Sequence, residues 1–106
     1  MQQFDKTLSV PNNVAQNLLA FVVANGYTGF QLNPLADNLC LTAPSDTILY
    51  HGNSGAITAA APSRSIAAGV SYPFPRTVDL SQIWIIHNGG AAKNVGISFT
   101  GLGEHN

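Results

Sequence analysis

The segment IIHNGGAAKN, residues 85–94, contains residue types that resemble a phosphate-binding loop. Two consecutive glycines, Gly89 and Gly90, are followed three residues later by Lys93. A Walker-type loop places Lys and then Ser or Thr at the start of a helix. Here Asn94 follows the lysine, and the next residues alternate with the strand period of two. Without a helix N-terminus, the partial positive charge that attracts phosphate is missing.

A β-hairpin explains the same segment completely. Ile83 and Ile85 share one face of a strand, and Trp84 shares the other face with Ile86. The dipeptide Asn88-Gly89 readily adopts positive φ, and Gly90 extends the turn. We therefore predict that this loop turns the chain and joins two strands.

The three histidines suggest a metal site, but their spacing does not support one. His51, His87 and His105 stand on separate segments, and no two have the spacing of metal ligands on one element. An enzyme or a metal-binding, cupin-like domain that uses His51 and His87 is our third hypothesis. Cys40 has the surroundings of a small packing residue rather than of a nucleophile.

The remaining polar residues form no catalytic pattern. The carboxylates are isolated and stand beside turn residues, and the serines lack a nucleophile-elbow sequence. We predict that the protein is not an enzyme and that it has no catalytic, cofactor-binding or metal-binding residues. The acids are Asp5, Asp37, Asp46, Asp79 and Glu104, and the serines are Ser63, Ser65 and Ser71.

One helix is expected near the N-terminus, over about residues 13–25. It follows a short strand at 6–10 that Pro11 ends. Asn13 is a suitable N-cap with Gln16 three residues later, and apolar residues from Val14 to Val22 repeat every three to four positions. Gly26 provides a left-handed C-terminal residue. Because this helix is almost uncharged, we expect it to pack closely on a sheet.

The rest of the chain, over residues 38–100, reads as short strands separated by turns. Strands are expected at 38–43 and 47–52. The segment 69–80 alternates, but its two prolines place it at a sheet edge or in an extended arm over 69–78. We predict an α+β or mainly β domain over residues 1–106. Its architecture would be a small antiparallel β-sandwich or barrel, with one N-terminal helix packed on it and a C-terminal β-hairpin.

Composition restricts the function further. Only 8% of the residues are charged, against about 25% in ordinary soluble domains, and the formal net charge is -1. Four scattered Lys and Arg residues are too few for nucleic acid binding. No apolar run reaches the roughly 20 residues of a membrane span, and the N-terminus does not read as a signal peptide. A surface so poor in charge is typical of one covered by other subunits.

Two stretches, AQNLLAFVVANGY (15–27) and IWIIHNGGAAKNVGISF (83–99), together with the small-residue, β-rich middle, resemble small virion proteins of tailed bacteriophages. The resemblance implies a head decoration or cement protein, often a trimer. Its partners would be its own copies and the major capsid protein or another virion protein. It would be assembled in the host cytoplasm and located in the virion.

Aromatic residues supply the candidate contacts. We predict that SYPFPR (71–76) docks on a neighbouring subunit, with Tyr72, Phe74, Arg76 and Trp84 at the interface. Two alternatives remain open. One is a tail-, neck- or fibre-associated virion component, and the other is a small carbohydrate-binding β-module that stacks the same aromatics on sugar rings.

Overall fold

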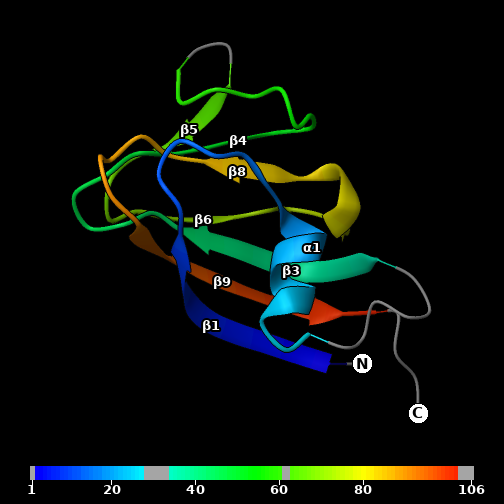
Figure 1. Cartoon of the computed structure of the whole chain (residues 1–106). Coiled ribbons are helices and arrows are strands. Elements are labelled where there is room, and N and C mark those ends of the chain that lie inside the picture. Colours follow the sequence, from blue (N-terminus) through cyan, green and yellow to red (C-terminus); the bar gives the residue numbers. More distant parts are fainter. Residues whose placement is uncertain (1, 28–33, 61–62, 103–106) are drawn as a thin grey trace.

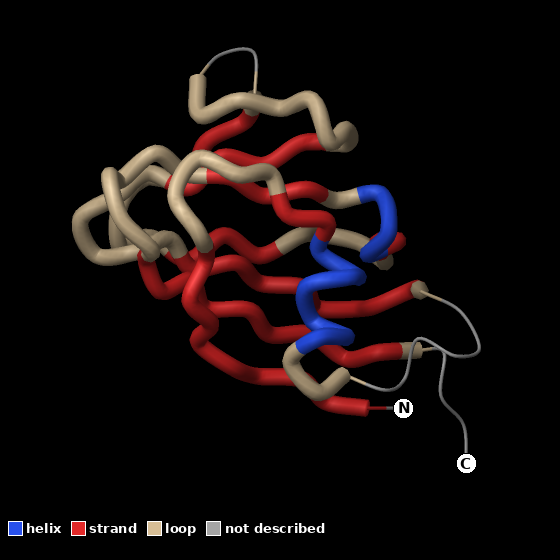
Figure 2. The backbone as a smooth tube through the Cα atoms, viewed as in Figure 1, coloured by secondary structure: helices blue, strands red, loops and turns tan. Residues whose placement is uncertain are grey.

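The computed structural model describes residues 2–27, 34–60 and 63–102. It contains two antiparallel sheets and one α-helix, which confirms the predicted mainly β class (Figures 1 and 2). The five-stranded sheet has the order β1-β9-β3-β6, with β7 also pairing with β3, and the four-stranded sheet has the order β2-β8-β4-β5. The strands are β1 (Gln2–Val10), β2 (Gln16–Asn17), β3 (Leu35–Thr42), β4 (Leu49–Gly52), β5 (Arg64–Ile66), β6 (Ser71–Pro73), β7 (Val78–Asp79), β8 (Trp84–Ile86) and β9 (Lys93–Gly101).

Strand β1 is longer than the predicted strand at 6–10. It pairs with β9 along its whole length, from Gln2↔Gly101 to Val10↔Lys93. Asp5 and Lys6, which follow Phe4, obscured the strand pattern before residue 6. Lys6 is accommodated because its ammonium group lies 5.6 Å from the centre of the Phe4 ring and donates to the Asn25 carbonyl (2.7 Å).

The helix α1 (Leu18–Ala24) is shorter than predicted, and its N-cap is Asn17 rather than Asn13. The Asn17 side chain accepts a hydrogen bond from the Ala20 N–H (3.1 Å). Asn13 instead has a left-handed φ of 55°. Gln16 and Asn17 form strand β2 because they pair with β8, and this pairing competes successfully with the helical pattern. The predicted left-handed conformation of Gly26 is confirmed, with φ 109°.

The predicted C-terminal hairpin is not formed. β8 pairs with β2 and β4, whereas β9 pairs with β1 and β3, so residues 87–92 cross from one sheet to the other. β8 is apolar throughout, β9 alternates apolar residues with polar residues or glycine, and each lies inside its own sheet. In this connection it is Gly90, with φ 89°, that adopts positive φ, rather than Asn88-Gly89.

Two crossings between the sheets run side by side. The first connects β1 to β2 over residues 11–15, and the second is the 87–92 connection. The Asn13 N–H donates to the His87 carbonyl (2.7 Å), and the Gly90 N–H donates to the Asn12 side chain (3.0 Å). His87 is fully buried, and its Nε2 hydrogen-bonds the Val10 carbonyl (2.8 Å). The crossings therefore hold each other in place.

A bulge in β3 keeps the core side chains on one face. The register with β9 shifts between Asp37 and Cys40, and Asn38 has a left-handed φ of 58°. Ala36 and Leu39 are consequently both buried, although three positions separate them. Cys40 is half-buried on the opposite face, so it is not the core residue that the sequence suggested.

The segment 69–78 lies along its own domain instead of extending as an arm. β6 is the edge strand next to β3, which confirms the edge alternative. The Phe74 N–H donates to the Leu39 carbonyl (2.7 Å), and β7 pairs with residues 35–36. These backbone bonds anchor both ends of the proline-containing stretch.

Buried residues of both sheets and of α1 form one hydrophobic cluster. At one end of it, Phe99 stacks on Phe4 (ring centres 5.1 Å apart) and meets Tyr27 edge-on (4.9 Å). The Tyr27 hydroxyl is buried and has no hydrogen-bond partner within the described residues. Gly101 lies directly beside this hydroxyl, and a Cβ at Gly101 would overlap it.

We predict that Gly101→Ala lowers the free energy of unfolding by about 1–3 kcal/mol because the new methyl group collides with the Tyr27 hydroxyl. Tyr27→Phe should be neutral or stabilising, since it removes an unsatisfied buried group. In the Tyr27→Phe background, Gly101→Ala should cost less. Urea unfolding followed by circular dichroism measures all four proteins of this cycle. An equal cost in both backgrounds would contradict the proposed clash.

Candidate functional site

The loop at 85–94 is not arranged as a phosphate site. Lys93 is the first residue of strand β9, and its ammonium group pairs with the Asp46 carboxylate (2.9 Å). The hydrogen bond from Lys93 is the largest cause of the lowered pKa of Asp46, and the hydrogen bond from the Thr47 hydroxyl is the second. A strand follows the glycines in place of a helix, so the segment connects two strands, although these lie in different sheets and do not form the predicted hairpin.

The histidines do not converge on a metal site. Both ring nitrogens of His87 are engaged, Nε2 with the Val10 carbonyl and Nδ1 with the Gly89 N–H (3.1 Å). His51 packs against aromatic rings. Within residues 2–27, 34–60 and 63–102, no three His, Cys, Asp or Glu side chains are grouped in a way that could hold a metal. His105 and Glu104 lie outside the described residues.

The described carboxylates that make side-chain hydrogen bonds use them in contacts within the fold. Asp79 caps the 3-10 helix η2 (Leu80–Gln82), where its Oδ1 accepts from the Ser81 N–H (2.9 Å) and the Ser81 hydroxyl (2.6 Å). Asp37 accepts a hydrogen bond from the Thr77 hydroxyl. The contacts of Asp79 agree with the position beside a turn that the sequence predicted, whereas the turn predicted at Asp37 is wrong because this residue lies within strand β3.

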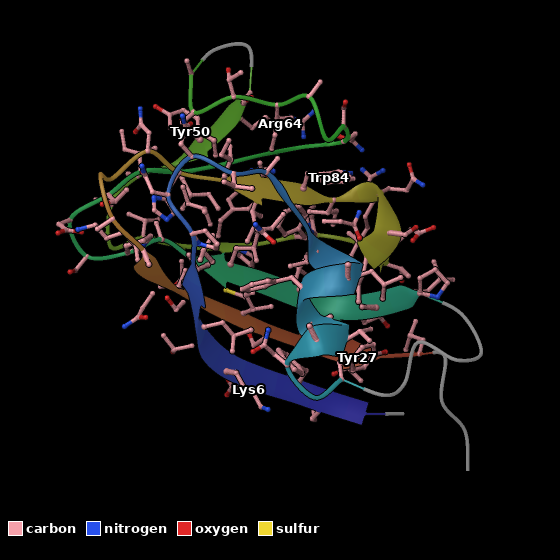
Figure 3. The ribbon with its side chains drawn as sticks, in the orientation of Figure 1. Lys6, Tyr27, Tyr50, Arg64 and Trp84 are labelled. Carbon is pink, nitrogen blue, oxygen red and sulfur yellow. The ribbon has the colours of Figure 1, made fainter. Side chains whose placement is uncertain are left out.

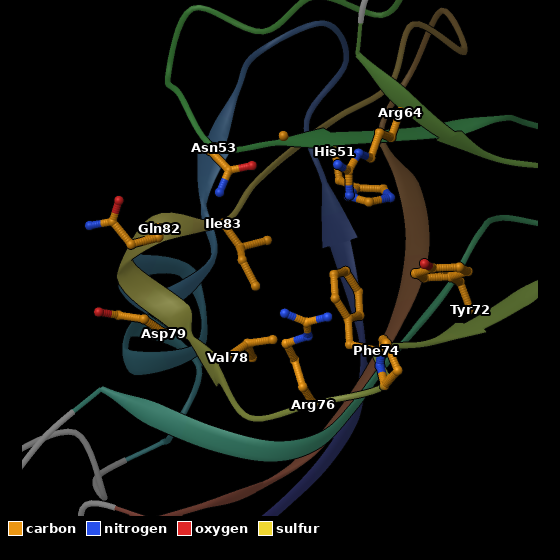
Figure 4. Close-up of a pocket in the computed structure, with 12 residues that line it drawn as sticks. His51, Asn53, Arg64, Tyr72, Phe74, Arg76, Val78, Asp79, Gln82 and Ile83 are labelled. Atoms are coloured by element: carbon orange, nitrogen blue, oxygen red, sulfur yellow. The ribbon is translucent and has the colours of Figure 1, made fainter.

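A cavity of about 480 Å³ lies where the edge of the five-stranded sheet meets the four-stranded sheet (Figure 4). β4 and the start of β5 form one wall, β6 and the residues after it form a second, and β7 with η2 forms a third. Ligand sites in proteins typically have volumes of about 300–1,000 Å³. The cavity is therefore large enough for a small ligand.

Three rings form the aromatic wall of the cavity. His51 is only 6% exposed, and its ring centre lies 5.8 Å from that of Tyr72 and 5.4 Å from that of Phe74. Tyr72 and Phe74 meet edge to face, with ring centres 5.1 Å apart. Burial, together with the nearby Arg64 charge, lowers the pKa of His51. The His51 ring, whose neutral form is favoured by this shift, joins β4 of one sheet to β6 of the other.

Polar groups surround an apolar floor. Val78 and Ile83 line the floor, while the amides of Asn53 and Gln82 stand at the rim (Figure 4). Arg64 and Arg76 also line the cavity, as does Asp79. Figure 4 shows the Arg76 side chain extending inward between Val78 and Phe74, and Arg64 beside His51.

A second hollow of about 410 Å³ adjoins the first. The two share His51, Gly52, Asn53 and Arg64, and the second continues along the loop that joins β4 to β5. The two hollows therefore lie on either side of these shared residues, a pair of neighbouring hollows that we call the groove.

The structure brings together three of the four predicted interface residues. Tyr72, Phe74 and Arg76 all line the cavity, whereas Trp84 does not. Trp84 is half-buried on β8 of the four-stranded sheet (Figure 3), and its ring packs close to Gly55, where an added Cβ would lie 3.1 Å from the nearest ring atom.

Sequence reasoning missed the residues that complete this cavity, namely His51, Asn53, Arg64, Asp79 and Gln82. They come from three separate stretches, at 51–53, at 64 and at 79–82. The only local sequence signal for the cavity was the proline-containing segment SYPFPR (71–76), which contributes Tyr72, Phe74 and Arg76 to its lining.

No protein-family model matches the chain, and no curated protein or solved structure gives a significant match. No helix in the described part of the chain is long and apolar enough to cross a membrane.

His51 should make stability depend on pH. Because burial and Arg64 lower the pKa of His51, the unfolded chain, with its ordinary value of 6.5, binds this proton more readily than the folded protein. The stabilisation is complete above pH 6.5 and is lost as the pH falls from there to the folded-state pKa. Urea unfolding between pH 7.5 and 5 should show this loss.

His51→Phe serves as the control because it keeps a ring at this position and removes the titration. Arg64→Gln should raise the pKa of His51 partway toward its ordinary value and reduce the loss, which an NMR titration of the ring protons can follow. An identical pH dependence in the wild type and His51→Phe would contradict this assignment.

Proposed function

We propose that the chain is a structural protein of a bacteriophage virion, of the decoration or cement type. It would stabilise the head through contacts between its own copies and with the capsid protein. A tail, neck or fibre location in the virion requires the same binding properties. Such a protein would work by burying surface against its partners. The contacts of His87, Asp79 and Lys93 within the fold are compatible with this role.

The free edge of β1 is the observation that carries this proposal. β1 has nine residues, its register with β9 is uninterrupted, and no other described strand pairs with it. An exposed edge of this length is a template for pairing with another chain. Natural edges are usually protected by Lys, Pro, a bulge or shortness. The one lysine of β1, Lys6, is instead drawn to the Asn25 carbonyl at the end of α1.

The other sheet edges are protected. β6 has three residues and ends in Pro73, β5 has three residues and begins with Arg64, and β2 has two residues. The contrast with β1 supports pairing of a partner chain at the β1 edge and not at the other described edges. The low charged fraction of 8% supports the same conclusion, because it provides little repulsion between copies.

We also infer that the two sheets are the layers of a small open β-sandwich and not a closed barrel. Both sheets contribute to one core, and β1 and β6 end the five-stranded sheet without pairing with each other. Closure of a barrel removes such edges.

Lysines placed on β1 should abolish self-association. We expect the wild type to scatter light as a discrete oligomer and Thr7→Lys/Ser9→Lys to be monomeric, since both side chains are exposed on this edge strand. The matched control, Ser65→Lys/Ala67→Lys at the β5 edge, should remain oligomeric. A wild type that stays monomeric at high concentration would contradict assembly through β1.

The measured mass also identifies the symmetry. Pairing of β1 with β1 of a second copy gives a two-fold dimer, whereas the trimer implied by the resemblance requires β1 to meet a different surface of the next copy. Co-sedimentation with empty capsids tests the contact with capsid protein separately.

A second candidate function is carbohydrate binding. The cavity supports it, because Tyr72 is accompanied there by the amides of Asn53 and Gln82 and by the Asp79 carboxylate. Sugar sites combine an aromatic surface for the ring with polar groups for the hydroxyls. A virion or a cell surface would be a suitable location for such a module.

If the cavity binds sugars, Tyr72→Ala should weaken binding several-fold, up to about tenfold, because the stacking surface is lost. Tyr50→Ala is the control, since Tyr50 is half-buried on β4 but does not line the cavity. Calorimetry with a panel of neutral and acidic oligosaccharides measures both variants. Equal affinities for the two variants would remove Tyr72 from the site.

A further inference from the structure

We infer that the cavity between Arg64, Arg76 and Tyr72 binds a saccharide that carries a carboxylate. This inference rests on the second candidate function, carbohydrate binding, and is independent of assembly through β1. It specifies the charge of the ligand and the side chains that recognise it.

The distribution of the cations is the first observation. The chain has four cationic residues, and the two lysines are used internally, Lys6 at the Asn25 carbonyl and Lys93 in the pair with Asp46. Both arginines line the cavity, and neither forms an ion pair or a side-chain hydrogen bond with another described residue. Planar guanidinium groups are suited to bidentate recognition of a carboxylate.

The cavity has no acid that neutralises both guanidinium groups. Asp79 is the one carboxylate in its lining, and the backbone and side chain of Ser81 hold its Oδ1. The cavity is therefore positive within a chain whose formal net charge is -1. The charge of Arg64 also reaches the aromatic wall, where it contributes to the lowered pKa of His51.

The shape and lining indicate a saccharide and not a small inorganic anion. Tyr72 is 40% exposed, and its ring is supported by His51 and Phe74, so one surface is available for a sugar ring. Asn53 and Gln82 can donate to and accept from hydroxyl groups. The adjoining hollow of about 410 Å³ provides space for a second sugar unit beyond Arg64.

The test compares acidic oligosaccharides with their methyl esters, which have the same rings without the charge. Tetramers containing galacturonate or glucuronate and a sialylated trisaccharide are titrated calorimetrically into the full chain, with inorganic phosphate as a separate arm. We expect the acids to bind at least about tenfold more tightly than the esters. Arg64→Gln and Arg76→Gln should each remove most of this difference. Lys93→Gln, which removes one positive charge away from the cavity, should preserve it.

The outcomes separate the inference from the function on which it rests. Preference for the acids that is lost in both arginine variants supports the inference. Equal binding of acids and esters that is weakened by Tyr72→Ala overturns the carboxylate assignment and leaves carbohydrate binding intact. Binding of phosphate as tightly as of the acids overturns the saccharide assignment. Absence of binding to every saccharide overturns both, provided that circular dichroism shows the protein to be folded.

Discussion

The paired crossing between the sheets is the constraint on which the rest of the structure depends. Residues 11–15 leave the five-stranded sheet beside residues 87–92, which return to it. His87 joins the two crossings, because its carbonyl accepts from Asn13 and its ring bonds to Val10 and Gly89. Each crossing fixes the start of one strand, β2 or β9. Because β2 leads directly into α1, the same contacts also position the beginning of the helix.

Sequence periodicity identified elements whose environment is local. The strand containing Leu39 and Leu41 alternates as predicted, and the positive φ of Gly26 ends the helix. The largest errors concern residues 13–17 and 87–92, at the crossings between the sheets. The helical pattern from Asn13 was overridden by pairing of β2 with β8, and Asn88-Gly89 resembled a hairpin turn although β8 and β9 lie in different sheets. The partner of a strand depends on distant residues, so local patterns could not reveal these pairings. For the same reason, local patterns could not show which residues line the cavity.

The two candidate surfaces lie at opposite ends of the molecule (Figures 1 and 3). β1 forms the outer edge of the five-stranded sheet, where Lys6 lies, while Arg64 lies in the β5 region of the four-stranded sheet. A copy paired at β1 therefore leaves the groove accessible. The cationic residues are also divided by role. The two lysines make contacts within the fold, and the two arginines line the cavity.

The position of β9 has a consequence for folding. β9 lies between β1 and β3, and its partners in β1 are separated from it by most of the described sequence. Loop closure must therefore precede the contacts that stabilise this sheet, a topology associated with slow folding. Until β9 inserts, β1 and β3 both expose unpaired edges, and a chain with so few charges repels its neighbours weakly. Folding and intermolecular pairing consequently compete for β1, and dilution favours the folded chain.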